Sequence, residues 1–180
     1  MDKKELRKIL IQKLKMEKMP TSESVKEILM NNGIICAADN IFAYVPFKTE
    51  IDITSYLDWA VDNKSVFLPF CREPRELFYT QIYSGWQKGL TKSENKTMVP
   101  ICRASVNLNT IAGNTVILIP ALGFSSDGYR LGRGGGYYDC FLRKLKNNKN
   151  FISIGLGIKD QLIEFKPDSF DEKLDKLILI

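Results

Sequence analysis

Residues 130–139, which read RLGRGGGYYD, combine glycine and arginine in a way that suits phosphate binding. Glycine lets backbone amides approach a phosphate closely and adopt positive φ. The amides and the dipole of a following helix attract anions, and the guanidinium groups of Arg130 and Arg133 match phosphate oxygens. The segment therefore predicts a nucleotide-phosphate site between a strand and a helix. The alternative is a glycine-rich turn that binds no ligand.

Two familiar phosphate loops are excluded by the residues that follow the glycines. A P-loop requires Lys and then Ser or Thr after its last glycine, whereas Tyr137 and Tyr138 follow Gly136. A dinucleotide fingerprint spaced GxGxxG from Gly132 would require a glycine where Tyr137 stands. The chain also has no histidine. An imidazole general base is therefore excluded, and a phosphoryl transfer that relies on positioning and electrostatics is favoured.

Most of the net charge lies near the start of the chain. The net charge is +5, and residues 1–18 alone contribute +4. A basic segment of this kind suits an anionic small molecule, a phosphate or a nucleic-acid backbone, and a solvated helix face explains it equally well. This start lacks the apolar core of a signal peptide. The longest apolar run, residues 116–124, is shorter than the roughly 20 residues that span a bilayer. We therefore expect a soluble, cytoplasmic protein with no membrane partner.

The four cysteines are too widely spaced for a CxxC pair. Without histidine, they exclude a Cys/His zinc site and predict reduced, mostly buried side chains in a cytosolic protein.

Predicted strands and helices alternate along the chain. Helices are expected over residues 2–18 with Asp2 as N-cap, over a segment carrying Val25, Ile28 and Leu29 that ends near residues 31–33, and over residues 54–63 and 137–145. Strands are expected over residues 41–45, 65–70, 116–119, 151–158 and 177–180, and within 77–83. Residues 84–95 are predicted to form a long loop. This pattern predicts a single α/β domain over residues 1–180 with a central, largely parallel sheet.

At this point the residues resemble a known family. RLGRGGGYYD after PALGF is similar to the ATP-binding signature of the 5-formyltetrahydrofolate cyclo-ligases, also called methenyltetrahydrofolate synthetases. Residues 3–7 (KKELR) resemble the family's N-terminal KxxLR segment, and residues 45–54, with Glu50, resemble its folate-contacting strand and turn. Asp171 and Asp175 in FDEKLDKLIL resemble its terminal acidic motif. The resemblance covers nearly the whole chain and implies a three-layer fold related to sugar-phosphate isomerases and CoA transferases.

The resemblance implies a role for each residue that matches a family motif. The residues expected to contact ATP are Lys3, Lys4, Arg7, Arg130, Leu131, Gly132, Arg133, Gly134, Gly135, Gly136, Tyr137 and Tyr138. The residues expected to contact the folate are Val45, Glu50, Arg133, Gly134, Gly135, Gly136 and Tyr137. Arg133 and Tyr137 are the expected catalytic residues, and Asp139 and Asp171 are expected to hold Mg²⁺. Two of these acids also have ordinary structural interpretations, Asp139 as a partner of the helix dipole and Glu50 as a surface acid.

The implied reaction converts 5-formyltetrahydrofolate and ATP into 5,10-methenyltetrahydrofolate, ADP and phosphate. The formyl oxygen attacks the γ-phosphorus in line, and N10 then closes the ring as phosphate leaves. The partners implied are these small molecules, with no nucleic acid, and a monomer is expected.

Two features depart from the family's usual pattern. Gly135 stands where many members have lysine, and residues 89–100, GLTKSENKTMVP, replace the usual IxEP motif. A nucleotide-binding relative of the same fold without cyclo-ligase activity therefore stays open as an alternative. An RNA-binding module that uses the basic N-terminal helix is a third interpretation, which no RNP-type aromatic motif supports.

Overall fold

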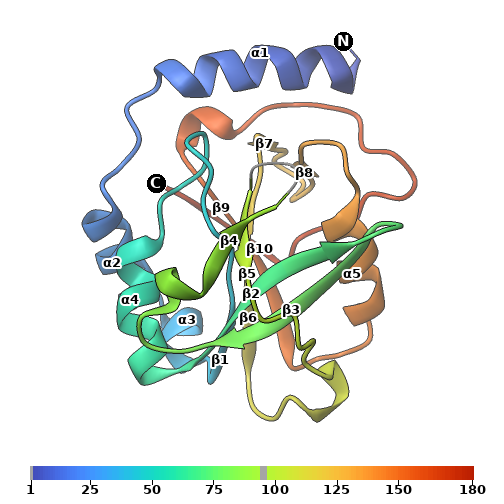
Figure 1. The fold of residues 1–180 in the computed structure, drawn as a ribbon. Helices are drawn as coiled ribbons and strands as arrows, with labels where there is room; N and C mark the ends of the chain where they lie inside the picture. The colour runs from blue at the N-terminus through green and yellow to red at the C-terminus, as the bar shows by residue number, and fades with distance from the viewer. Residues whose placement is uncertain (1, 94–96) are drawn as a thin grey trace.

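The structure is a computed structural model that describes residues 2–93 and 97–180. Figure 1 shows how its helices and strands are arranged. In chain order they are α1 (Lys3–Met16), α2 (Ser22–Met30), α3 (Gly33–Ala37), β1 (Asn40–Phe42), α4 (Thr54–Asn63), β2 (Ser65–Arg72), β3 (Glu76–Ile82), η1 (Trp86–Gly89), β4 (Leu90–Lys92), β5 (Met98–Pro100), η2 (Leu108–Thr110), β6 (Thr115–Pro120), β7 (Gly123–Phe124), β8 (Arg130–Leu131), α5 (Tyr137–Leu145), β9 (Phe151–Gly157), η3 (Lys159–Gln161) and β10 (Lys176–Leu179).

Six of these strands form one central sheet in the order β10-β9-β6-β1-β2-β3. The neighbouring strands are parallel throughout, except that β2 and β3 form an antiparallel hairpin. The α/β class with a central, largely parallel sheet is confirmed.

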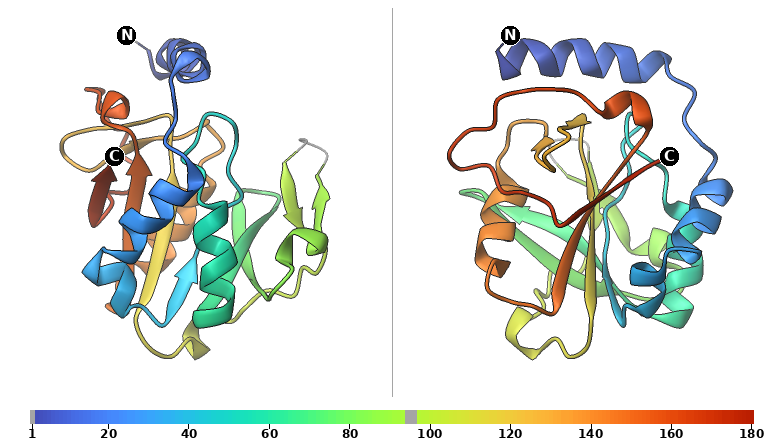
Figure 2. Two further views of the ribbon diagram at one scale, coloured as in Figure 1. Left: turned by 90° about the vertical axis from the view of Figure 1, so that its left-hand side faces the viewer. Right: turned by 180° about the vertical axis from the view of Figure 1, so that it is seen from behind.

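Helices cover both faces of the sheet, because the central strands are apolar on both sides. In β6, Val116 and Leu118 pack in the same cluster as residues of α2, α3 and α4, whereas Ile117 and Ile119 pack in the cluster that includes Phe141 of α5. Successive strand residues point to opposite faces, so one strand serves both clusters. Figures 1 and 2 show the resulting three layers.

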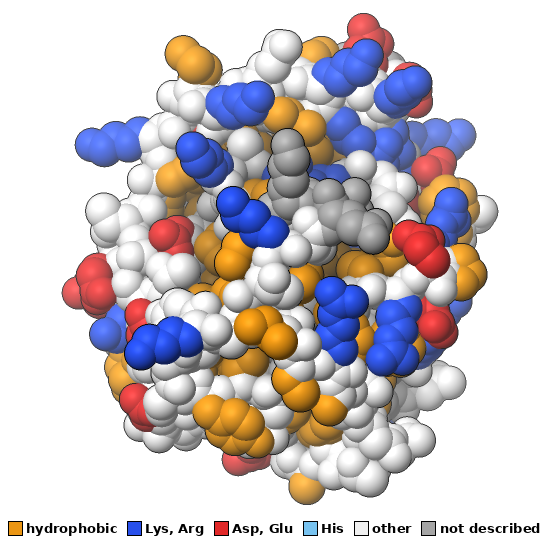
Figure 3. Space-filling view, in the orientation of Figure 1, with side chains coloured by type: hydrophobic (Ala, Val, Ile, Leu, Met, Phe, Trp, Pro, Cys, Tyr) orange, Lys and Arg blue, Asp and Glu red, His pale blue; other side chains and the backbone are white. Residues whose placement is uncertain are grey.

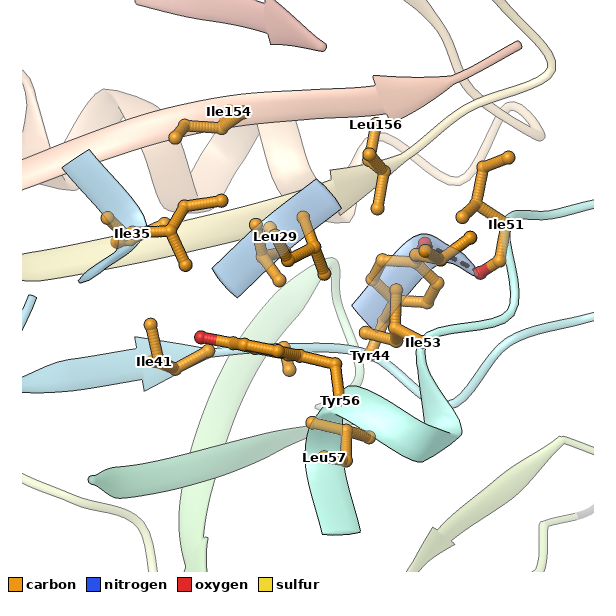
Figure 4. Packing of buried hydrophobic residues seen from close by; sticks show 14 of the residues in the cluster. Leu29, Ile35, Ile41, Tyr44, Ile51, Ile53, Tyr56, Leu57, Ile154 and Leu156 are labelled. Atoms are coloured by element: carbon orange, nitrogen blue, oxygen red, sulfur yellow. Dashed lines mark hydrogen bonds between the residues drawn. The ribbon is translucent and has the colours of Figure 1, made fainter. Parts of the chain in front are cut away.

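Figure 4 shows part of the first cluster at close range. Leu29 of α2 and Ile35 of α3 lie beside Ile154 and Leu156 of β9. Removing each such aliphatic side chain from water contributes about 1.5–3 kcal/mol to the free energy of unfolding.

Helix α1 packs one leucine-rich face on the rest of the molecule. Leu6, Leu10 and Leu14 recur at intervals of four residues and are buried, whereas Ile9 between them is half exposed. Figure 1 shows α1 lying across the end of the molecule that carries β7 and β8. Asp2 occupies the N-cap position, as predicted, although its side chain makes no capping hydrogen bond. Within residues 2–93 and 97–180, no helix has the length and apolar character needed to cross a membrane.

The connections of β1 and β6 create a crevice between these neighbouring strands. From β1 the chain passes through α4 to β2, and from β6 it passes through α5 to β9 on the opposite side of the sheet. Ligands of open α/β sheets bind where the connections diverge in this way, beyond the carboxyl ends of the strands. The segments that follow β1 and β6 are therefore placed to form a site.

Two features of the first part of the chain differ from the prediction. The second helix ends at Met30, close to its predicted end near residues 31–33, but Gly33 begins a further helix, α3, that the sequence did not predict. The reason is Asn32, whose side chain accepts hydrogen bonds from the amides of Ile34 and Ile35 and so caps a new helix. The strand expected over residues 41–45 is assigned only over β1, which ends at Phe42.

The long loop predicted over residues 84–95 was wrong in its described part. It contains η1 and β4, and β4 pairs antiparallel with β5 in a separate two-stranded sheet. Figure 2 shows this β4–β5 hairpin standing beside the main sheet. Residues 94 and 95 of the predicted loop lie outside the described residues.

The prediction that the cysteines are mostly buried was also wrong. All four are free, but Cys36, Cys71 and Cys102 are exposed and Cys140 is half-buried. Cys71 lies near the exposed end of β2, and Cys102 follows the end of β5, so their positions at strand ends outweigh their apolar character.

Candidate active site

A cavity of about 850 Å³ lies beyond the carboxyl ends of β1 and β6. Its size and position suit a small-molecule site in an open α/β sheet. The cavity brings together all the residues to which the sequence assigned a role, namely Lys3, Lys4, Arg7, Val45, Glu50, Arg130, Leu131, Gly132, Arg133, Gly134, Gly135, Gly136, Tyr137, Tyr138, Asp139 and Asp171.

Basic side chains gather at this end of the molecule. Figure 3 shows Lys and Arg concentrated over the upper half of the face, where α1 crosses. Such a surface attracts anionic ligands.

The glycine ribbon, residues 132–136, connects β8 to the start of α5. Gly134 has φ of +102° and Gly136, the N-cap of α5, has φ of +72°, a region that favours glycine. A Cβ on Gly135 would lie 2.8 Å from ring carbons of Tyr137. The positive φ therefore favours glycine at Gly134 and Gly136. The N-terminal amides of α5 remain available to an anion.

Arg133 joins this ribbon to the segment after β1. Its Nε lies 3.3 Å from Oε1 of Glu50, and one Nη donates to Oγ1 of Thr49 at 2.7 Å. Its guanidinium carbon lies 4.3 Å from the centre of the Phe47 ring, within range of a cation–π interaction. The two segments that diverge from the sheet are thus connected across the cavity.

Glu50 carries the carboxylate of this connection and is itself nearly buried. Burial raises the pKa of Glu50 above its ordinary value, because a carboxylate loses solvation there. The backbone amide of Phe47, which donates to Oε2, and the charge of Arg133 act in the opposite direction. Glu50 therefore holds a proton more readily than a surface glutamate.

Arg130 lies deeper than Arg133 and pairs with Asp139. Its side chain is 4% exposed, and one Nη lies 3.0 Å from Oδ2 of Asp139. Its guanidinium lies 5.4 Å from the centre of the Tyr138 ring. Burial lowers the pKa of Arg130, which Asp139 opposes, and arginine remains charged near neutral pH. Its Nε has no hydrogen-bond partner, so this buried cation still has a donor for a ligand.

Helix α1 brings two cations to the other side of the ribbon. Nε of Arg7 donates to the carbonyl of Gly132 at 2.8 Å. Nζ of Lys3 pairs with Asp168 at 2.7 Å and also with Asp171. The Lys3 contacts attach the start of the chain to the segment after β9. They also place a predicted phosphate cation beside a predicted metal ligand, Asp171.

The two predicted metal ligands lie close together on the cavity wall. Oδ1 of Asp139 accepts the backbone amide of Glu172, the residue next to Asp171, at 3.1 Å. No group of three or more His, Cys, Asp or Glu side chains in the described part of the chain could hold a metal ion. Any metal here would therefore draw most of its ligands from substrate and water.

Tyr137 faces the turn between β2 and β3. Its hydroxyl donates to Oε1 of Glu73 at 2.6 Å, and this hydrogen bond is the main cause that raises the pKa of Tyr137. The tyrosine is therefore fixed as a donor at the entrance to α5.

Several residues in or beside the cavity were not found from the sequence. Phe47, Thr49, Glu73, Arg75 and Asp168 contact or flank the predicted residues. Of these, only Arg75 could have been proposed from the sequence. It is a cation in the polar segment CREPRE, and it could have been grouped with the other candidate phosphate-binding cations. The remaining contacts depend on how distant segments are placed.

Comparisons with known proteins agree with this geometry. The family described as "5-formyltetrahydrofolate cyclo-ligase family" matches residues 1–179. A Haemophilus influenzae protein named 5-formyltetrahydrofolate cyclo-ligase is 30% identical over 169 residues, covering 91% of this chain and 87% of the relative. A Mycoplasma pneumoniae protein of the same name is 28% identical, covering 99% of this chain and 98% of the relative.

Solved structures show the same fold. The NMR structure of Aquifex aeolicus 5,10-methenyltetrahydrofolate synthetase matches with a TM-score of 0.80 and 28% identity, covering 99% of this chain and 90% of that one. A structure of a 5,10-methenyltetrahydrofolate synthetase from Mycoplasma pneumoniae matches with a TM-score of 0.70 at 23% identity, covering 99% of this chain and 98% of that one. The resemblance seen in the sequence is confirmed: this chain belongs to the 5-formyltetrahydrofolate cyclo-ligase family.

Proposed function

We propose that this chain catalyses the ATP-dependent conversion of 5-formyltetrahydrofolate to 5,10-methenyltetrahydrofolate, with release of ADP and phosphate. The observation that carries the proposal is the shared cavity, which the glycine ribbon lines on one side and the segment containing Val45 and Glu50 lines on the other. One wall suits a polyphosphate and the other offers a partly apolar surface with a single carboxylate.

The ribbon is the proposed triphosphate site. The amides of residues 134–136 and of the first turn of α5 donate to phosphate oxygens. Lys4 and Arg7 of α1 and the buried Arg130 line the same cavity. Preorganised donors of this kind stabilise the charge that develops on a transferring phosphoryl group.

Arg133 is the proposed link between the two substrates. Glu50 and Thr49 hold its Nε and one Nη, so the other Nη remains available to an oxygen of the phosphoryl group. The formyl oxygen then attacks the γ-phosphorus, and N10 displaces phosphate as the ring closes. Tyr137, fixed by Glu73, closes the wall beside the reacting atoms.

We propose that Asp139 and Asp171 hold Mg²⁺ together with the phosphates of ATP. The fit rests on two carboxylates at the same cavity wall, because magnesium commonly takes one or two carboxylates and completes its shell with phosphate and water. The ion would supply charge neutralisation and orientation of the phosphates. Arg130 and Lys3, the present partners of these carboxylates, hold them in place without it.

We also propose that residues 1–180 form one catalytic domain that acts as a cytoplasmic monomer. One central sheet with helices on both faces supports the single domain, and free cysteines suit a reducing compartment. Sedimentation of the purified protein at a dimer mass would contradict the monomer.

The decisive experiment mixes the protein with Mg-ATP and 5-formyltetrahydrofolate and follows the ultraviolet absorbance of the methenyl product. The absorbance should rise only when both substrates are present. If ATP binds but the full mixture stays silent, the chain is a nucleotide-binding relative without cyclo-ligase activity.

A further inference from the structure

The turn between β2 and β3 lies beside the glycine ribbon. Its Glu73 accepts the hydroxyl of Tyr137 at 2.6 Å, which ties the turn to the start of α5. Arg75 in the same turn lines the cavity, and its Cδ lies 3.8 Å from where a Cβ on Gly136 would stand. The side chain therefore passes over the point where the ribbon enters the helix.

Arg75 has an unusual backbone conformation. Its φ is +60°, and it is the only residue other than glycine with positive φ among residues 2–93 and 97–180. This region is strained for a residue with a Cβ, and strain of this kind concentrates at functional sites. A glycine would satisfy the turn better, so the turn itself does not explain why an arginine stands here.

Three of the other cavity cations differ from Arg75 in their pairing. Lys3, Arg130 and Arg133 each pair with a carboxylate. The described part of the chain offers Arg75 no hydrogen-bond or ion-pair partner, although its guanidinium has five donors. Its charge is thus uncommitted at the mouth of an anion site.

Arg7 and Arg75 flank the ribbon from two elements far apart in the sequence. Cζ of Arg7 lies 3.7 Å from where a Cβ on Gly134 would stand, and Cδ of Arg75 is at 3.8 Å from the equivalent point on Gly136. An anion resting on the ribbon amides would thus lie within reach of one guanidinium from α1 and another from the β2–β3 turn.

We propose that Arg75 is a phosphate-binding residue that contacts the distal phosphates of a nucleoside triphosphate across the ribbon. The inference deepens the proposed function, because it rests on the ribbon being the triphosphate site. A guanidinium in this place matches phosphate oxygens with paired donors and neutralises charge that the paired cations leave unbalanced.

The test compares Arg75→Ala and Arg75→Lys with Arg103→Ala. Arg103 is exposed, lies outside the cavity and carries the same charge, so its replacement controls for net charge. Binding of a non-hydrolysable ATP analogue and of AMP is measured by calorimetry. Arg75→Ala should raise the Kd of the ATP analogue by about tenfold or more, because a charged hydrogen bond to a distal phosphate is lost. It should raise the Kd of AMP, which lacks the distal phosphates, by less than about twofold. Arg75→Lys should restore part of the affinity, and Arg103→Ala should bind like the parent protein.

Unchanged affinity of Arg75→Ala for the ATP analogue would overturn the inference, and so would an equal loss for AMP. Failure of the proposed function is a separate result. If the parent protein binds the ATP analogue but forms no methenyl product, the proposed cyclo-ligase activity is wrong. The effect of Arg75→Ala on binding of the analogue still decides the role of Arg75.

Arg75→Gly provides an independent readout. It removes the guanidinium and also relieves the positive φ. The thermal midpoint should rise by about 2–4 °C while affinity for the analogue falls as in Arg75→Ala. A variant that is stabilised and still binds the analogue like the parent protein would contradict the proposal.

Discussion

Nε of Arg133 lies 3.3 Å from Oε1 of Glu50, although the two residues are 83 positions apart in the chain. This ion pair crosses the crevice between the segments that follow β6 and β1. It couples the wall proposed for the nucleotide to the wall proposed for the folate, so changes at either residue should be felt by both substrates.

Replacing Arg133 tests this coupling. Arg133→Ala should raise the KM for ATP by more than about tenfold, because a charge-assisted phosphate contact is lost. It should also raise the KM for 5-formyltetrahydrofolate, because Glu50 loses its cation. Steady-state kinetics with each substrate varied in turn measures both effects. Unchanged kinetics would remove Arg133 from the site, and Lys144→Ala, an exposed cation outside the cavity, serves as the control.

Glu50 should make the free energy of unfolding depend on pH. Burial raises its pKa in the folded chain, so the folded state binds this proton more tightly than the unfolded state does. Its contribution to the free energy of unfolding is fully present below the unfolded pKa, about 4.3, and is lost as the pH rises through the folded value. Urea unfolding at several pH values should show this decline in the parent protein relative to Glu50→Gln. If the difference in free energy of unfolding between the two proteins does not change with pH from about 4.3 upward, the pKa of Glu50 is not raised.

The pair formed by Arg130 and Asp139 should be structurally important before any ligand binds. Asp139→Asn leaves a nearly buried guanidinium without its carboxylate and should lower the free energy of unfolding by about 3–5 kcal/mol. Asp160→Asn breaks the exposed pair with Lys13 and should cost about 0–1 kcal/mol. Chemical denaturation compares the two variants. If both variants lose the same small amount of free energy of unfolding, Arg130 finds another partner when Asp139 is replaced.

Helix α1 offers a matched pair of truncations. Leu10 is 3% exposed and Ile9 is 47% exposed. Leu10→Ala should lower the free energy of unfolding by about 2–5 kcal/mol through a packing defect, and Ile9→Ala should change it by less than about 0.5 kcal/mol. If the leucine variant also weakens ATP binding while the isoleucine variant does not, docking of α1 positions Arg7 at the ribbon. Equal thermal midpoints for both variants would show that α1 packs more loosely than described.

Removing magnesium should separate activity from folding. A chelator should abolish methenyl formation, and added Mg²⁺ should restore it, while the thermal midpoint of the nucleotide-free protein stays unchanged. The reason is that Arg130 and Lys3 already pair with Asp139 and Asp171. Full activity in the presence of chelator would contradict the proposed metal role.

The sequence predicted best where local chemistry determines the structure. Helix α5 spans Tyr137–Leu145, the predicted range, because a glycine N-cap, a first-turn acid and an apolar face all lie within a few residues. The sequence missed α3, because Asn32 follows the end of α2 and at the same time caps a new helix. It also failed at β4, whose strand character depends on pairing with β5.

Within the site, the sequence could identify residue types but not their partners. Glycines and arginines in one decapeptide indicated an anion site, and the structure places all of them at one cavity. The pairing of Arg133 with Glu50 depends on two segments brought together only by the sheet. The position of Arg75 depends on a single backbone angle, which no pattern of residue types encodes.

The position of β6 between β1 and β9 has a consequence for biosynthesis. A nascent chain that has emerged only as far as β3 holds β1 with one of its two neighbours and lacks the ribbon altogether. The site can assemble only after β6 inserts into the middle of the sheet, a late, long-range step of the kind that slows folding. Ribosome-bound chains truncated before β6 should therefore expose the apolar edge of β1 to chaperones.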